Sequence, residues 1–118
     1  MDHMTAGSLD GRRFAAVANV GGEVGADTVF EYHEGAGEVW ATYQGGAVVH
    51  GFLVGTRTAD TLDIRYVQLN DHGETSGGHC VSAIQELPDG RIRLDEKWEW
   101  ESRPGVGTSV VEELGPPR

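Results

Sequence analysis

Residues 91–101 carry the pattern with the clearest chemical meaning in this chain. Every odd-numbered residue of the run is charged, whereas the even-numbered residues are apolar except for Glu96. Because successive side chains of a β-strand point to opposite faces, Glu96 is expected on an otherwise apolar face with Trp98 and Trp100. A carboxylate in such a place either finds a partner or keeps its proton with a raised pKa.

Two interpretations of Glu96 follow from its position. In the functional one, it is an acid/base catalyst, or the anchor for a ligand that lies between walls formed by Trp98 and Trp100. In the structural one, an arginine, a tyrosine or a buried water holds the carboxylate in place. Both interpretations remain open at the level of the sequence.

Residues 61–69 supply polar groups that could act with Glu96. Alternation places Tyr66 and Gln68 on the same inner face as two apolar residues, so their hydroxyl and amide could orient a ligand. In an enzyme, Tyr66 could be the second proton-transfer group. We expect Arg65 on the outer face, paired with Asp63; a bulge in this strand would instead put Arg65 next to Glu96.

Further residues are expected to face the same interior. In residues 77–86, Cys80 and Ser82 are expected to share the inward face, so His79 points outward, which argues against His79 as the base for a Cys80 nucleophile. We therefore expect Cys80 to be a small buried residue. Tyr32 and Tyr43 could reach the cavity from residues 27–33 and 38–44, or could serve packing alone.

Metal and cofactor sites are not predicted. The histidines are scattered, and Cys80 is the single cysteine, so the four converging ligands of a closed zinc site are missing. The segment Gly35-Ala36-Gly37 lacks the third glycine and the following helix of a dinucleotide-binding motif, and no Gly-Lys-Ser/Thr phosphate loop is present.

Composition narrows the classes of partner. The 118 residues include 9 Lys and Arg against 19 Asp and Glu, a formal net charge of −10, which disfavours nucleic acids and anionic membrane surfaces. No apolar stretch is long enough to span a membrane. The single cysteine and the absence of a signal-peptide pattern at the start predict a cytoplasmic protein.

These residues must be positioned by β-strands, because the whole chain alternates between β-type runs and glycine-bearing breaks. Eight runs are expected, and none has helical periodicity. The clearest break is Pro88-Asp89-Gly90, a turn signal. The predicted strands are residues 13–20, 27–33, 38–44, 47–57, 61–69, 77–86, 91–101 and 107–113.

Eight short strands with tight connections predict an all-β fold. An antiparallel up-and-down barrel of the calycin or lipocalin type leaves no unpaired edges, and its interior can hold one small ligand. A two-sheet β-sandwich is the alternative. We expect a flexible arm over residues 1–11, one domain over 12–114 and a disordered tail over 115–118.

Three segments (residues 45–55, 62–66 and 87–100) resemble a family of short, single-domain bacterial proteins of unknown function, often labelled N-acetylglutamate synthase. The resemblance covers residues 13–114. It implies a bacterial cytoplasmic barrel and leaves its activity open.

Two functions from different classes are therefore carried forward. The first is a binding barrel for one small apolar or aromatic molecule. The second is a cofactor-independent isomerase, cyclase or lyase that uses Glu96 as its buried acid/base. The sequence leaves open whether the protein is a homodimer, and it shows no obvious long apolar patch for self-association.

Overall fold

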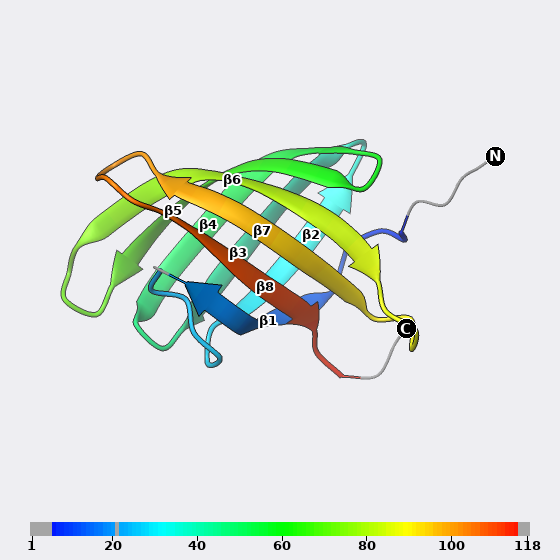
Figure 1. Ribbon diagram of the computed structural model, residues 1–118, viewed down its shortest axis with the longest axis horizontal. Helices are drawn as coiled ribbons and strands as arrows, with labels where there is room; N and C mark the ends of the chain where they lie inside the picture. Colours follow the sequence, from blue (N-terminus) through cyan, green and yellow to red (C-terminus); the bar gives the residue numbers. More distant parts are fainter. Residues whose placement is uncertain (1–5, 21, 116–118) are drawn as a thin grey trace.

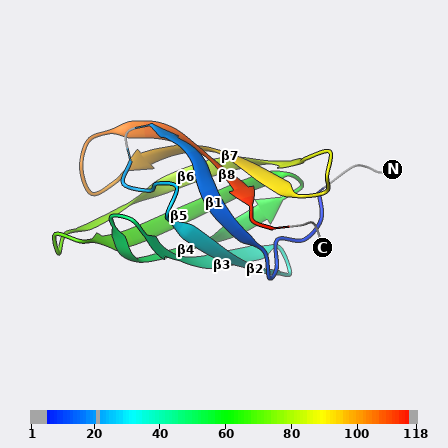
Figure 2. The same cartoon turned by 90° about the horizontal axis from the view of Figure 1, so that it is seen from below.

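The chain folds into a closed barrel of eight antiparallel strands, each paired with the next along the sequence and the last paired with the first (Figure 1). The computed structural model describes residues 6–20 and 22–115. The closed ring of strands is also evident at right angles (Figure 2). The up-and-down barrel predicted from the sequence is thus confirmed, and the sandwich is excluded. The strands are β1 Arg13–Val20, β2 Val29–Gly35, β3 Glu38–Gly45, β4 Val48–Thr58, β5 Thr61–Asn70, β6 Thr75–Glu86, β7 Ile92–Trp100 and β8 Val106–Glu113.

Tight turns set the register of neighbouring strands. Between β2 and β3, Ala36 and Gly37 have φ of 55° and 78°, the positive values that a two-residue hairpin turn requires. Between β6 and β7, the Gly90 amide donates to the Leu87 carbonyl (2.9 Å), so the predicted turn at residues 88–90 is present. No helix in the described part of the chain is long and apolar enough to cross a membrane.

The inward side chains of the strands form one hydrophobic core inside the barrel. On β7, Ile92, Leu94, Glu96 and Trp100 are buried, and Trp98 is half-buried, in agreement with the predicted alternation. The core also draws on every other strand, including Phe14, Phe30, Val39, Leu53, Leu62, Ile84 and Val111. Burial of this apolar surface is the main force that holds the strands in this register.

The two ends of the barrel differ. At one end, here called the closed end, the segment that precedes β1 packs against the strands (Figure 1, blue). Leu9 is fully buried, its amide donates to Glu34 Oε1 (2.8 Å), and the Ala6 amide donates to Asp60 Oδ1 (2.9 Å). Residues 6–11 are therefore a packed part of the domain, where the sequence predicted a flexible arm. Residues 1–5, the rest of that arm, and 116–118 of the predicted tail lie outside the described residues.

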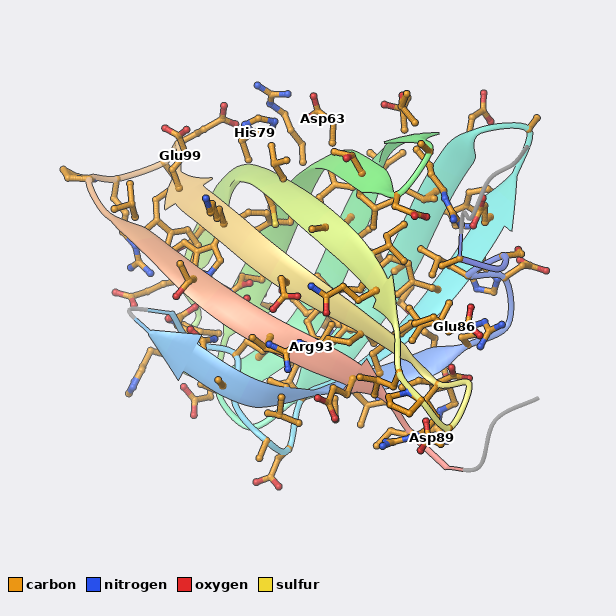
Figure 3. All side chains as sticks on the ribbon, turned by 45° about the vertical axis from the view of Figure 1, so that its right-hand side comes forward. Asp63, His79, Glu86, Asp89, Arg93 and Glu99 are labelled. Atoms are coloured by element: carbon orange, nitrogen blue, oxygen red, sulfur yellow. The ribbon has the colours of Figure 1, made fainter. Side chains whose placement is uncertain are left out.

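The outer face carries ion pairs and one apolar patch. Asp63, His79 and Glu99 project away from the barrel (Figure 3), and His79 Nε2 lies 2.6 Å from Asp63 Oδ1. Arg65 is also outside, as expected, but it pairs with Glu101 (3.1 Å) and not with Asp63. The patch, which the sequence did not reveal, is formed by Trp40, Phe52, Val54 and Val67, all at least 45% exposed.

Candidate functional site

A cavity opens at the other end of the barrel, called here the open end, where the strand pairs β1–β2, β3–β4, β5–β6 and β7–β8 are connected. Its volume is about 50 Å³, which is room for roughly three to five water molecules. It is lined by residues from all eight strands and by the loop before β2. The lining residues are Asn19, Gly22, Glu23, Val24, Phe30, Tyr43, Leu53, Ile64, Tyr66, Gln68, Cys80, Glu96, Trp98, Trp100 and Ser109.

Aromatic rings form much of the cavity wall. Trp98 and Trp100, two residues apart on β7, meet edge to face with their ring centroids 5.4 Å apart. Tyr66 on β5 meets Trp100 in the same manner at 5.7 Å, and its hydroxyl donates to the Glu99 carbonyl (3.1 Å). Such rings offer flat apolar surfaces at small entropic cost, because each side chain has only two rotatable angles.

Glu96 is a buried carboxylate in the middle of strand β7. Its residue is 8% exposed, and Oε1 accepts a hydrogen bond from Ser109 Oγ at 2.6 Å. Burial raises the pKa of Glu96 to about 7, although the Ser109 hydroxyl acts in the opposite direction. Arg65, the cation that a bulge would have brought to Glu96, lies on the outer face. The carboxyl group therefore titrates near neutral pH.

A chain of hydrogen bonds links the open end of the barrel to the loop before β2. Tyr43 Oη donates to Gln68 Oε1 (2.9 Å), and Gln68 Nε2 donates to Glu23 Oε1 (2.8 Å). Asn70 Nδ2 donates to the other oxygen of Glu23 (2.9 Å). Burial alone would raise the pKa of Glu23, but these donors outweigh it and the pKa is lowered. The ionised Glu23 thus fastens its loop across the cavity mouth.

The backbone of this loop lies directly on the indole of Trp98. A methyl group added at Gly22 would come within 3.0 Å of the Trp98 ring and within 3.0 Å of Asn19 Oδ1. Asn19 also donates to the Val24 carbonyl (2.6 Å), which holds the loop against β1. The loop therefore covers part of the cavity, and hydrogen bonds of Asn19 and Glu23 hold it there.

The structure brings most of the residues singled out from the sequence into this cavity. Those in the lining are Tyr43, Tyr66, Gln68, Cys80, Glu96, Trp98 and Trp100. Burial raises the pKa of Cys80 to about 12, so its thiol keeps its proton at neutral pH and is a poor nucleophile.

Two predicted ligand-binding residues lie outside the cavity lining. Ser82 is fully buried, and its Oγ lies 3.5 Å from Cys80 Sγ. Tyr32 is also fully buried, packs edge-on against Phe14 with ring centroids 5.2 Å apart, and has no hydrogen-bond partner for its hydroxyl among the described residues. Both side chains point into the barrel, but at heights along its axis where other side chains fill the interior, so both belong to the core.

Three polar residues of the cavity lining were missed by the sequence analysis. Ser109 lies opposite Glu96 in the register of β7 and β8, a fact that appears only when the two strands are paired. Asn19 lies near the end of β1, and Glu23 is in a loop with no pattern of its own. Carboxylates prefer hydroxyl and amide donors, but the sequence contains many such donors and does not indicate which of them lie near Glu96.

Comparison with known proteins identifies a family. The model of a family described as "Avidin-like protein" matches residues 7–114. No curated protein and no solved structure matches the chain.

Proposed function

The chain belongs to the avidin-like protein family, a family of small-molecule-binding barrels, and we propose that the molecule it binds has an apolar or aromatic body. The observation that carries this proposal is the aromatic wall formed by Tyr66, Trp98 and Trp100 around the cavity. Ligand sites are typically apolar pockets with a few fixed polar groups, and here Gln68 and Glu96 are such groups.

The small size of the cavity defines how a ligand enters. At about 50 Å³ it holds only a few waters, so a ligand with a ring must displace them and push aside part of the covering loop. Gly22, Glu23 and Val24 are the covering residues, and the hydrogen bonds of Glu23 are the contacts that must break.

Native mass spectrometry of freshly purified protein tests for a retained small molecule. Quenching of tryptophan fluorescence then measures binding of a panel of small aromatic compounds, with biotin included because the family is avidin-like. Cys80→Leu adds bulk inside the cavity and is expected to abolish binding. Val81→Leu is the matched control, because Val81 is the next residue on β6 and is 41% exposed.

Equal binding by wild type and Cys80→Leu would show that the ligand does not occupy the cavity. If Cys80→Leu fails to fold, Trp98→Ala tests the cavity instead, because it removes an aromatic ring from the cavity wall and is expected to abolish binding.

A cofactor-independent isomerase, cyclase or lyase is the second candidate. The observation that favours it is a buried Glu96 with a pKa of about 7, a value suited to both taking and giving a proton near neutral pH. Tyr66 is the proposed second group, and burial raises its pKa well above the ordinary value. Recovery of a retained molecule chemically unchanged after incubation favours binding, whereas its conversion, lost in Glu96→Gln, favours the enzyme.

We also propose that the apolar patch of Trp40, Phe52, Val54 and Val67 contacts a second copy of the chain. Trp40 is paired with Val54 across β3 and β4, and Phe52 with Val67 across β4 and β5, so the four side chains lie together. An exposed apolar patch is typical of a protein–protein interface. Light scattering is expected to show a dimer that Phe52→Glu dissociates.

A further inference from the structure

The charged residues that line the cavity are all acidic. Two carboxylates, Glu23 and Glu96, belong to its lining, and none of the lining residues found in the described part of the chain is Lys, Arg or His. A low-dielectric site with negative groups and no cation repels anionic ligands and attracts cationic ones. The charges of the lining therefore favour a cationic ligand, as the aromatic wall favours an apolar or aromatic body.

Glu96 has an unused hydrogen-bonding position. Ser109 donates to Oε1, while Oε2 accepts no hydrogen bond from the residues that the structure describes. The residue is 92% buried and lines the cavity, so a donor inside the cavity is what can reach that oxygen. An isolated buried carboxylate is costly unless a positive donor joins it.

The chain itself places a cation at the outer edge of this site. The guanidinium of Arg103, in the loop between β7 and β8, lies over the Trp100 ring at 4.3 Å from its centroid. The same group is 4.0 Å from Glu23 Oε2. An indole face together with a carboxylate is a recognised arrangement for binding organic cations.

We propose that the ligand carries a protonated nitrogen, an amine or amidine, that binds the carboxylate of Glu96 while its apolar or aromatic body lies against Trp98 and Trp100. The proposal rests on the proposed function and narrows its ligand to organic cations. In this complex the nitrogen donates to Glu96 Oε2, and the indole faces contribute cation–π attraction. Arg103 competes for the outer part of the same surface.

Binding of such a cation is expected to depend on pH through Glu96, because burial of Glu23 is outweighed by its hydrogen bonds to Asn70 and Gln68, which lower its pKa and keep that second carboxylate ionised. The groups around it are Cys80 on β6, the tyrosines 32, 43 and 66 on β2, β3 and β5, Ser109 on β8, and Asp95 beside it on β7, which is paired with Arg93. Burial raises the pKa of the thiol and of the three hydroxyls above their ordinary values, so these groups stay neutral between pH 5 and 8.

The test uses three ligands of nearly equal shape: benzylamine as the cation, benzyl alcohol as the neutral analogue and benzoate as the anion. Tryptophan fluorescence at pH 8 is expected to show benzylamine binding about tenfold more tightly than benzyl alcohol, and benzoate not binding. Because the ligand prefers ionised Glu96, the affinity for benzylamine is expected to fall as the pH is lowered through 7, by about tenfold in total, the same loss that is expected for Glu96→Gln.

Matched variants assign the effect to Glu96. Glu96→Gln is expected to weaken benzylamine about tenfold and to remove its pH dependence, with benzyl alcohol changed by less than about threefold. Glu99→Gln makes the same change of charge on the outer face of the same strand and is expected to match the wild type (Figure 3). Arg103→Ala is expected to tighten benzylamine a few-fold, whereas Arg65→Ala, on the outer face, does not.

The outcomes separate this proposal from the proposed function. Equal or tighter binding of benzyl alcohol, abolished by Cys80→Leu, would keep the small-molecule cavity and overturn the cation. Binding of none of the three compounds would also overturn the cation, and native mass spectrometry would still decide whether the cavity holds another ligand. Benzylamine binding that Glu96→Gln leaves intact would place the cation elsewhere and overturn the role of Glu96.

Discussion

Glu96→Gln is expected to make the protein more stable above neutral pH. The wild-type carboxyl has a pKa of about 7 in the folded protein and an ordinary value of 4.5 in the unfolded chain. Below pH 4.5 it is protonated in both states and adds no pH dependence. Between pH 4.5 and 7 the unfolded chain releases this proton while the folded protein keeps it, so the folded state loses relative stability as the pH rises. Above pH 7 both states are ionised and the loss is constant.

The size of the effect follows from the difference between the two pKa values. Each unit corresponds to about 1.4 kcal/mol, so ionised Glu96 lowers the free energy of unfolding by about 3 kcal/mol above pH 7. This is a large share of the stability of a domain of this size. Glutamine keeps the volume and can still accept the hydrogen bond from Ser109, but its amide introduces a donor that needs a partner, at a cost of about 1 kcal/mol at every pH.

The measurement is urea unfolding of wild type and Glu96→Gln between pH 4.5 and 8.5, followed by tryptophan fluorescence. The quantity to compare is the difference in unfolding free energy, which is expected to change by about 3 kcal/mol in favour of the variant as the pH rises through this range. Glu99→Gln is the control, because Glu99 is exposed on the outer face of β7, and its difference from wild type is expected to stay within about 0.5 kcal/mol throughout. A difference for Glu96→Gln that does not vary with pH would refute the burial of an unpaired carboxylate.

Two further predictions concern the frame around the site. Leu9→Ala is expected to lower the free energy of unfolding by about 3 kcal/mol, since Leu9 is fully buried, whereas Ser8→Ala, at an exposed position, changes it little. Equal effects of the two substitutions in urea denaturation would contradict the packing of residues 6–11. Gly55→Ala is expected to lower the free energy of unfolding by about 1–3 kcal/mol, because its methyl group would collide with the backbone of β5. In Gly35→Ala, the control, the added methyl group meets nothing within 4 Å. Equally small effects of both substitutions in thermal unfolding would contradict the close approach of β4 and β5.

The fold was predictable because its signals are local. Alternation fixes which side chain of each strand faces inward, and the observed ends of all eight strands lie within two residues of the predicted ones. Turn residues such as those at 88–90 then force successive strands to run antiparallel. Once eight strands pair in order, closure of the barrel follows from the cost of leaving two edges exposed.

The candidate site was predictable only where one strand contained the whole signal. Glu96, Trp98 and Trp100 belong to a single alternating run, so their shared face could be inferred without knowing the partners of β7. The hydroxyl that meets Glu96 comes from Ser109 on the neighbouring strand, and its contact depends on the register of β7 and β8. Glu23 reaches the site from a loop, where no periodicity constrains the direction of a side chain.

The same reasoning explains why the predicted partner of Arg65 was wrong, although its predicted position on the outer face was right. Alternation puts Asp63 and Arg65 on the outer face, but it says nothing about which neighbour each contacts there. The register of β5 and β6 pairs His79 with Arg65 and makes it a diagonal neighbour of Asp63, which its ring contacts. The turn of the chain after β7 brings Glu101 to Arg65. Contacts between strands are thus the level at which a single sequence ceases to be informative.

The cost of Glu96 connects stability with ligand binding. A residue kept only for packing gains nothing from a charge that lowers stability by about 3 kcal/mol at neutral pH, since glutamine or leucine would fill the space without it. A local arrangement that opposes stability is typical of a functional position. A bound cation would offset that cost, because it stabilises the ionised carboxylate in the folded state alone and so shifts the unfolding equilibrium toward the native barrel. The affinity for a cationic ligand and the loss of stability above neutral pH therefore both depend on the same buried charge, that of Glu96.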